Sequence, residues 1–350
     1  MSMKIKIGRH KVGANLPCFI IAEAGVNHNG KLDLALQLVD AAQKVGADAI
    51  KFQTFKAKKL VTPSAQKAGY QKASTAPDET QFEMLKKLEL GSQDFVAISQ
   101  HCQKQGIIFL SSPFDEESID FLDSMGVPAF KIPSGEINNL PYLKAVGAKA
   151  KPVILSTGMS SMQDVEMAVQ TLKSTGNAAI ILLHCVSNYP ADPADVNLRA
   201  MQTLRDTFGL PVGFSDHTMG IEIPLAAAAL GACVIEKHVT LDRSLEGPDH
   251  KASIEPDELS SMVQGIRKIE AALGDGIKSR RASEEEIAAV VRKSLVAKID
   301  LPAGTVIRSE MIDARRPGSG LPPTMADAIL GRTLGVPLKA GDLFSLDMFL

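Results

Sequence analysis

Eight short apolar runs, each followed by a longer stretch with helical spacing, constrain the fold of this chain more than any other feature. The runs are CFIIAEAG, DAIKFQT, GIIFLSSP, PAFKIPS, KPVILSTG, AAIILLHCVS, LPVGFSDH and ACVIEKHV. Near-continuous apolar strands that alternate with amphipathic helices predict a parallel sheet covered by helices. Eight such units in roughly 275 residues predict an α/β fold, a (β/α)8 TIM barrel, with an open doubly wound sheet as the alternative.

Helical spacing is clearest between the first two runs, in GKLDLALQLVDAAQKVGA. Leu32, Ala35, Val39 and Ala42 fall on one face of a helix, and Gly46 follows as a stop signal. The stretches SMQDVEMAVQTLKSTG and PDELSSMVQGIRKIEAALG show the same pattern. A doubly wound sheet would normally carry a glycine-rich dinucleotide turn after an early strand, and AEAGVNHNG is not a GxGxxG motif. The barrel is therefore the favoured fold.

Two segments stand outside the repeating pattern. TFKAKKLVTPSAQKAGYQKASTAPDETQ separates the second and third runs, and a connection of this length is uncommon unless it is functional, so it is a candidate lid. After Gly276 the chain reads as a charged linker over 277–292 and then as short strands and turns over 293–350. We predict a catalytic barrel over 1–276 and a small β-rich domain that buries too little surface to stand without a partner.

Charge, apolar patterning and cysteine spacing exclude several classes of function. The formal net charge is −2, so no global basic field would attract nucleic acid or an anionic membrane. The basic start lacks the apolar core of a signal peptide, and no apolar run reaches the length of a membrane span. The cysteines lie far apart without a CxxC motif, which is typical of free thiols in a reducing cytoplasm. We therefore expect a cytoplasmic protein that binds neither nucleic acid nor membrane.

Polar residues gather where the apolar runs end. In a barrel, the carboxyl ends of all strands deliver their side chains to one mouth. In chain order these residues are Glu23, Lys51 and Gln53, Ser111 and Ser112, Lys131 and Ser134, Ser156 and Thr157, His184 and Ser187, Asp216 and His217, and Glu236 and His238. A single serine among them caps a helix as readily as it binds a ligand. Eight polar strand ends in register predict an active site.

Two of these residues, His217 and His238, end the last two runs, which are neighbours in the expected strand order. Converging imidazoles at adjacent strand ends favour a divalent metal site over two satisfied core histidines. Glu236 lies two residues before His238 on the same side of its strand, and would coordinate the metal or accept a ligand's second ring proton. Asp249 and Glu23 are further oxygen candidates.

Lys51 and Lys131 sit within apolar runs, so both side chains must face something anionic. A carboxylate such as Glu136 would satisfy them. Two lysines beside Ser134, Ser156 and helix N-termini would instead form a pocket for phosphate and carboxylate groups. Either lysine could also form a Schiff base, as in some aldolases, and this alternative competes with the metal because one electrophile usually suffices.

Long motifs follow one another along the chain, namely IIAEAGVNHNG, AIKFQTF, KIPSGEINNLPYL, ILSTGM, HCVSNYPADPADVNLR, FSDHTMG, IEKHVTLD and GPDHKAS. Together they resemble the sialic acid synthase family over essentially the whole chain. Near the C-terminus, AKIDLPAGTVI and RRPGSGLPP look like that family's small antifreeze-like (SAF) domain. The resemblance implies a metal-dependent enzyme that condenses phosphoenolpyruvate with an N-acylated mannosamine and water, giving a nonulosonic (sialic) acid and phosphate.

The resemblance also implies roles for residues of this sequence. His217 and His238 would bind a divalent ion, usually manganese, with magnesium or cobalt as alternatives. Arg316 would reach the active site of the partner subunit to meet the N-acyl group, which implies a domain-swapped homodimer. The residues implied in catalysis are Glu23, Asp249, Lys51 and Lys131. Those implied in substrate binding, besides Arg316, are Gln53, Ser112, Ser134, Ser156, Tyr189 and Glu236.

The implied chemistry accounts for this charge pattern. Phosphoenolpyruvate is a trianion and needs the two lysines, and the aldehyde oxygen of the open sugar needs a Lewis acid as it gains charge. Water addition before phosphate leaves needs a base, for which Glu23 is the first candidate and Asp249 the second. We expect N-acetylmannosamine as the acceptor, giving N-acetylneuraminate. One alternative acceptor is 2,4-diacetamido-2,4,6-trideoxymannose, which would give legionaminate, and another is a 6-phosphorylated sugar. An alternative of a different enzyme class is a Schiff-base sialate aldolase.

Overall fold

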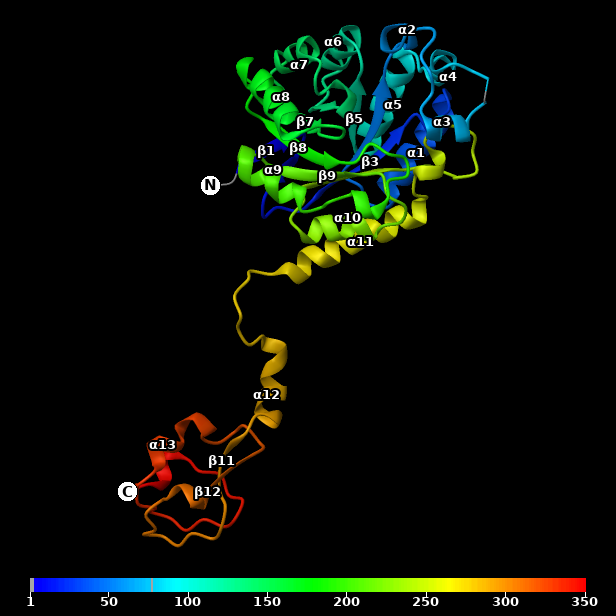
Figure 1. The fold of residues 1–350 in the computed structure, drawn as a ribbon. Helices are drawn as coiled ribbons and strands as arrows, with labels where there is room; N and C mark the ends of the chain where they lie inside the picture. Colours follow the sequence, from blue (N-terminus) through cyan, green and yellow to red (C-terminus); the bar gives the residue numbers. More distant parts are fainter. Residues whose placement is uncertain (1–2, 77) are drawn as a thin grey trace. The chain divides into compact units, whose positions relative to one another are not determined.

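The computed structural model describes residues 3–76 and 78–350, and the chain divides into two compact units, Met1–Gly274 and Asp275–Leu350 (Figure 1). The first unit contains an eight-stranded sheet in the order β5-β4-β3-β10-β9-β8-β7-β6. Its strands are β3 (Phe19–Gly25), β4 (Ala49–Thr54), β5 (Ile108–Pro113), β6 (Phe130–Ile132), β7 (Val153–Ser156), β8 (Ile180–Cys185), β9 (Val212–Asp216) and β10 (Val234–His238).

The sheet curls into a nearly closed parallel barrel. The first and last strands in the chain, β3 and β10, pair with each other, and β5 contacts β6 at the remaining seam. All eight predicted runs form barrel strands. The predicted TIM barrel is therefore confirmed, and the open sheet is excluded.

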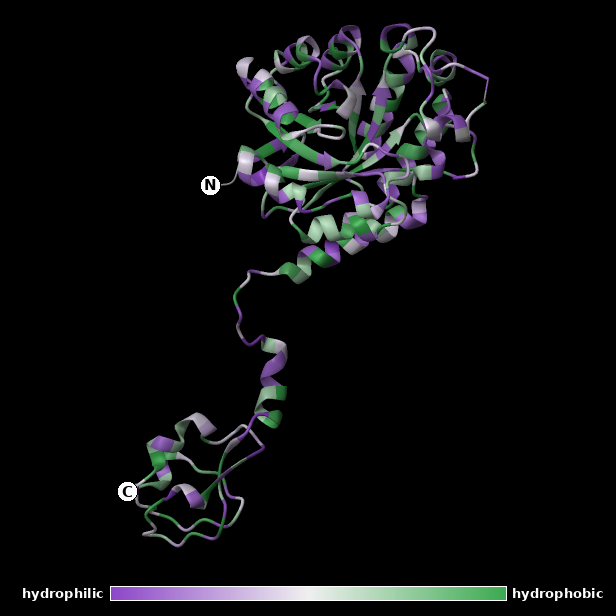
Figure 2. Ribbon diagram, viewed as in Figure 1, coloured by the Kyte–Doolittle hydropathy of each residue, from purple (hydrophilic) through white to green (hydrophobic). Residues whose placement is uncertain are grey.

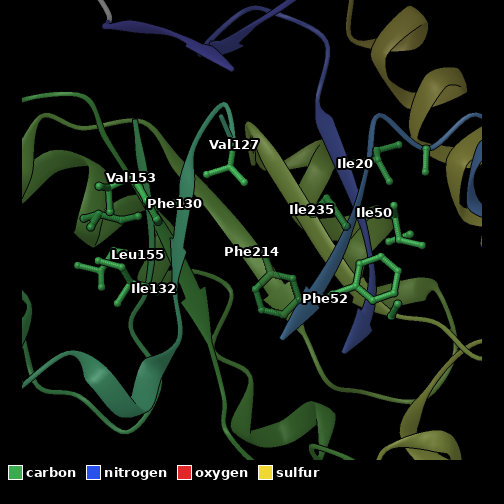
Figure 3. Close-up of a cluster of buried hydrophobic side chains, with 14 of the residues drawn as sticks. Ile20, Ile50, Phe52, Val127, Phe130, Ile132, Val153, Leu155, Phe214 and Ile235 are labelled. Atoms are coloured by element: carbon green, nitrogen blue, oxygen red, sulfur yellow. The ribbon is translucent and has the colours of Figure 1, made fainter. Parts of the chain in front are cut away.

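A helix follows each strand and covers the outside of the barrel. These helices are α1 (Leu32–Lys44), α5 (Ser92–Gln105), α6 (Glu116–Ser124), α7 (Leu140–Gly147), α8 (Met162–Ser174), α9 (Ala200–Phe208), α10 (Glu222–Ala229) and α11 (Pro256–Leu273). In α1 the predicted apolar face is buried through Ala35, Val39 and Ala42. Outward-facing strand residues such as Ile50 and Phe130 pack beneath the helices (Figure 3). Figure 2 shows hydrophobic strands inside a ring of helices that are hydrophobic on part of their surface only.

Inward-facing residues change character along each strand, because alternate side chains share one face of a strand. Near the amino ends these positions are apolar, and they include Phe19, Ile21, Ala49, Leu110, Ile154 and Val234. A hairpin of β1 (Lys4–Ile7) and β2 (His10–Gly13) closes this end with Ile5, Ile7 and Val12. This hairpin is not among the elements expected from the sequence. With one end closed by apolar packing, polar residues further along the same faces meet at the opposite, open mouth.

The long segment after β4 folds into three short helices, α2 (Ala57–Leu60), α3 (Gly69–Ser74) and α4 (Gln81–Leu88). The helix expected from about Phe82 is α4, which Thr80 caps by accepting the Glu83 N–H. A small apolar cluster, Val26, Phe55, Met84 and Leu88, anchors the segment to the barrel. Its described helices therefore pack against the barrel beside the mouth.

The second unit has its own small core. It contains α12 (Glu285–Val291), β11 (Ser294–Ala297), β12 (Ile312–Arg315) and α13 (Ala326–Ile329), and its core includes Leu295, Ile307, Leu334, Phe344 and Phe349. Short antiparallel contacts join distant segments, as between Leu301 and Leu338. These short strands and bridges agree with the small β-rich fold expected for the C-terminal part of the chain. In the described part of the chain, no helix has the length and apolar character needed to cross a membrane.

Candidate active site at the barrel mouth

A cavity of about 370 Å³ opens at the carboxyl ends of the barrel strands. Twelve of the thirteen residues expected in the site line it, namely Glu23, Lys51, Gln53, Ser112, Lys131, Ser134, Ser156, Tyr189, His217, Glu236, His238 and Asp249. The thirteenth, Arg316, belongs to the other compact unit. Residues far apart in sequence converge because parallel strands end at one rim. Their roles remain predictions.

Two lysines and two carboxylates form the buried floor of the cavity. Lys51 Nζ lies 2.7 Å from Glu23 Oε2 and 3.7 Å from Glu236 Oε2. Lys131 Nζ lies 3.4 Å from Glu236 Oε1. The carboxylates that balance the lysines are therefore strand residues of the barrel, and not Glu136. Glu236, considered above for the metal site, is the shared partner of both lysines.

The two floor carboxylates differ in protonation because their neighbours differ. Burial raises the pKa of Glu23 to about 7, even though Lys51 opposes the shift. Burial also acts on Glu236, but Lys131, Lys51 and a 2.8 Å hydrogen bond from Ser215 Oγ together lower its pKa to about 2. Glu236 is thus ionised at neutral pH. Glu23 exchanges a proton near neutral pH, which suits a general base.

Asp249 is the second carboxylate that suits a base. Burial raises its pKa to about 6, and Lys51 opposes the shift. Its side chain lines the cavity from the loop after β10. Glu23 and Asp249 therefore both titrate between acidic and neutral pH, and either can accept a proton there.

His217 and His238 lie close together at the mouth, with ring centroids 5.4 Å apart. His217 Nδ1 donates to the carbonyl of Val186 at 2.7 Å, which leaves the lone pair of Nε2 free. His238 Nδ1 is buried without a hydrogen-bond partner among the described residues. Burial lowers the pKa of both rings, that of His217 to about 4, so both are neutral imidazoles, the form that binds metals.

These observations fit a divalent cation held by two imidazoles. One ring is oriented by a backbone carbonyl, and the other carries an unsatisfied buried nitrogen. Among the described residues, no three or more His, Cys, Asp or Glu side chains form a metal-ligating group. The remaining ligands would therefore be oxygens of water or substrate.

An aromatic stack covers the histidine pair. The Tyr189 ring centroid lies 4.1 Å from that of His217 and 5.5 Å from that of His238. Tyr70 of α3 stacks on Tyr189 at 5.0 Å, so the segment after β4 forms part of the cavity wall. The length of this segment indicates a functional role, but no feature of the sequence distinguishes Tyr70 from its neighbours. Other cavity residues not anticipated include Val26, Gln71, Gln81, Met84, Leu85 and Phe114.

Four polar strand-end residues expected at the mouth lie outside the cavity lining, namely Ser111, Thr157, His184 and Asp216. All four have the parity of outward-facing positions, so they point away from the barrel axis. Asp216 Oδ2 pairs at 2.5 Å with Nζ of Lys237, which also faces outward. Thr157 and His184 line a separate cavity that α8 and α9 also line. Strict application of the two-residue period would have removed these four from the prediction.

Comparison with known proteins identifies the family. The profile of the NeuB family matches residues 38–278, and that of the SAF domain matches 292–350. The chain belongs to the NeuB family of sialic acid synthases. The predicted family and its C-terminal SAF domain are confirmed.

Named relatives match this NeuB-family enzyme over nearly its full length. It is 52% identical to N,N'-diacetyllegionaminic acid synthase of Legionella pneumophila over 94% of both chains. It is 51% identical to the enzyme of the same name from Campylobacter jejuni, over 93% of this chain and 98% of the relative. Human N-acetylneuraminate-9-phosphate synthase is 37% identical over 95% of this chain and 92% of its own.

A solved structure agrees with this assignment. The crystal structure of N-acetylneuraminic acid synthetase from Leptospira borgpetersenii superposes with a TM-score of 0.73 and 41% identity, covering 82% of this chain and 95% of that one. The chain is therefore an enzyme of the family that contains the sialic and legionaminic acid synthases.

Proposed function

We propose that this enzyme condenses phosphoenolpyruvate with 2,4-diacetamido-2,4,6-trideoxymannose and water, giving N,N'-diacetyllegionaminic acid and phosphate. The observation that carries the proposal is the 52% and 51% identity to two legionaminic acid synthases, against 41% to the N-acetylneuraminic acid synthetase of Leptospira borgpetersenii and 37% to the human N-acetylneuraminate-9-phosphate synthase. The acceptor expected from the sequence alone is N-acetylmannosamine, and these identities favour its alternative, the diacetamido-trideoxy sugar.

The cavity wall supports an uncharged acceptor with an apolar end. Val26, Met84, Leu85 and Phe114 supply apolar surface to the cavity, and a 6-deoxy sugar carries a methyl group that can pack there. Among the described cavity residues, Lys51 and Lys131 are the only lysine or arginine side chains. Both already pair with carboxylates. Both are needed to balance the phosphoenolpyruvate anion, so a sugar 6-phosphate would meet no further lysine or arginine among the described cavity residues, which argues against a phosphorylated acceptor.

The lysines and serines of the floor would bind phosphoenolpyruvate. Lys51 Nζ donates to Ser112 Oγ at 3.3 Å, so a cation and a hydroxyl already converge there. Ser156 Oγ is buried without a partner among the described residues, and such a group is costly unless a ligand completes it. Lys131 and Ser134 stand beside it in the cavity lining. This set matches a ligand that carries both a phosphate and a carboxylate.

The reaction needs one carbon–carbon bond, one water and one base. C3 of phosphoenolpyruvate attacks the aldehyde carbon of the open sugar, whose oxygen takes up a proton. Water adds to the resulting oxocarbenium carbon C2, and ionised Glu23, or Asp249, accepts the proton released. The C2–O bond to phosphate then breaks while the C2 hydroxyl gives its proton to the departing phosphate, leaving the 2-keto acid. A divalent ion on His217 and His238 would supply Lewis-acid polarisation of the aldehyde oxygen.

Phosphate release across a panel of acceptors tests this proposal. We expect kcat/KM with the diacetamido-trideoxy sugar to exceed that with N-acetylmannosamine or its 6-phosphate by about 100-fold, because binding and hydrogen bonding to the added acetamido group contribute to the transition state. Mass spectrometry identifies the product. Higher kcat/KM with N-acetylmannosamine would overturn the acceptor. Chelator-resistant activity combined with inactivation by borohydride plus substrate would indicate the aldolase class instead.

We further propose that the active form is the domain-swapped homodimer that the resemblance implies, with Arg316 serving the partner's cavity. Arg316 is exposed in the SAF-containing unit, and its guanidinium can donate to the carbonyl of an N-acyl group. Replacing Arg316 by alanine should raise the acceptor KM about 10-fold and leave that of phosphoenolpyruvate unchanged. Arg315→Ala, which removes an exposed ion pair to Asp313, is the matched control. Equal kinetics of the two variants would contradict the role of Arg316.

A further inference from the structure

The turn after β3 carries three polar residues in a row, Asn27, His28 and Asn29, and none of them lines the active-site cavity. His28 acts within the turn, where its Nδ1 accepts the N–H of Gly30 at 3.0 Å. The two asparagine side chains instead bond to the loop that follows β10 and carries Asp249. Their contacts therefore bear on the geometry of a proposed catalytic group.

Asn27 joins the two ends of that loop. Its Nδ2 donates to the carbonyl of Val239 at 2.8 Å and to Ser253 Oγ at 2.9 Å. Ser253 Oγ in turn donates to the carbonyl of Asp249 at 2.7 Å. Asn27 is only 2% exposed, so water does not compete for these bonds.

Asn29 holds the middle of the same loop. Its Nδ2 donates to the carbonyl of Glu246 at 3.0 Å, and its Oδ1 accepts from His250 Nε2 at 3.1 Å. Because the amide oxygen only accepts, the proton of His250 lies on Nε2, and Nδ1 then accepts from Thr240 Oγ1 at 2.7 Å. Asp249 is thus flanked on both sides by residues that the turn holds.

The atoms around these hydrogen bonds are closely packed. A Cβ placed at Gly247 would lie 2.7 Å from His250 Cδ2 and 3.0 Å from Asn29 Oδ1. The start of the loop is also bonded to β3, since the N–H of Val239 donates to the carbonyl of Glu23 at 2.8 Å. One turn therefore connects the strand that carries Glu23 with the loop that carries Asp249.

We propose that Asn27 and Asn29 are positioning residues that hold Asp249 at a fixed separation from Glu23 across the cavity. Neither asparagine touches the cavity, and each acts through the loop backbone or through His250. The inference rests on the proposed function, in which these two carboxylates handle the water and the sugar. Misplacement of a reacting group by about 1 Å can lower a rate about 100-fold.

Asn29→Gly provides the kinetic test. Asn29 has a φ of 50°, and glycine keeps this left-handed conformation while removing the whole side chain and with it both hydrogen bonds to the loop. We expect kcat to fall by about 10- to 100-fold and the acceptor KM to rise, while the KM for phosphoenolpyruvate stays within about twofold. The control is Asn15→Gly, the same change at an exposed residue with a φ of 60°, which should retain wild-type kinetics.

A double-mutant cycle separates positioning from a general loss of structure. In an Asp249→Asn background, Asn29→Gly should change kcat by less than about twofold, because the group that it positions is already disabled. The same factor in both backgrounds would overturn the proposal.

Hydrogen–deuterium exchange of residues 241–253 tests whether Asn29 holds this loop, and the measurement does not depend on turnover. Asn29→Gly should speed exchange in this loop, and Asn15→Gly should not. Unchanged exchange would overturn the positioning role. If the wild-type enzyme turns over no sugar of the panel, the proposed function fails, while the exchange result still decides whether Asn29 holds the loop.

Discussion

Replacing Lys51 by methionine is expected to lower kcat/KM for phosphoenolpyruvate by about 1,000-fold, a loss of ~4 kcal/mol of transition-state stabilisation. Lys51 is the buried cation nearest to Glu23 and also lies within 3.7 Å of Glu236. Methionine keeps the length and apolar contacts of the stem but removes the charge. The substrate trianion would then face two buried carboxylates with Lys131 as the remaining cation of the floor.

The same variant should change the pH profile in a defined direction. A base works only when ionised, so wild-type kcat/KM should be lost as the pH falls through the Glu23 pKa of about 7. Lys51 lowers that pKa, because a nearby cation favours the carboxylate. Without Lys51 the acidic limb should move to higher pH. A limb that stays in place would show that Glu23 is not the group being titrated.

Both expectations are checked by measuring initial rates of phosphate release between about pH 5 and pH 9, a range that includes the pKa values of these carboxylates. Lys149→Met is the matched control, because Lys149 pairs with Asp120 at 2.7 Å on the surface of the same unit. It should keep wild-type kinetics. A Lys51→Met enzyme with wild-type kcat/KM would contradict the assignment of Lys51 to the substrate anion.

Replacing His238 by glutamine should lower turnover to about 1% or less and weaken Mn²⁺ binding by about 100-fold, because one of the two imidazoles among the described cavity residues is lost. Titration calorimetry measures the binding separately from catalysis. Treatment of the wild-type enzyme with a chelator should remove activity, and adding back Mn²⁺, Mg²⁺ or Co²⁺ compares the ions.

His101→Gln is the control for this experiment, since His101 is a surface residue paired with Asp40 at 2.6 Å. It should bind Mn²⁺ as the wild-type enzyme does. Wild-type Mn²⁺ affinity in His238→Gln would remove the histidine pair as the metal site, whatever its effect on turnover.

Much of this protein could be predicted from the order of its residues. The barrel follows from eight apolar runs separated by amphipathic helices, because local periodicity decides which face of each element is buried. The mouth follows from the same period. In β3 the inward positions change from Phe19 and Ile21 to Glu23, and in β10 from Val234 to Glu236 and His238. Where these changes occur at one depth in many strands, a polar site must form.

Which side chains pair with one another could not be predicted in this way. Lys51 pairs with Glu23 and Glu236, and not with Glu136, because neighbouring strands and their stagger set which charges meet inside the barrel. Tyr70 reaches Tyr189 only through the folding of the segment after β4. The terminal hairpin was missed because two four-residue strands carry too little periodicity to stand out. Ion pairs, stacking and loop ties form between residues distant in sequence, and their energies depend on distances that spacing along the chain does not contain.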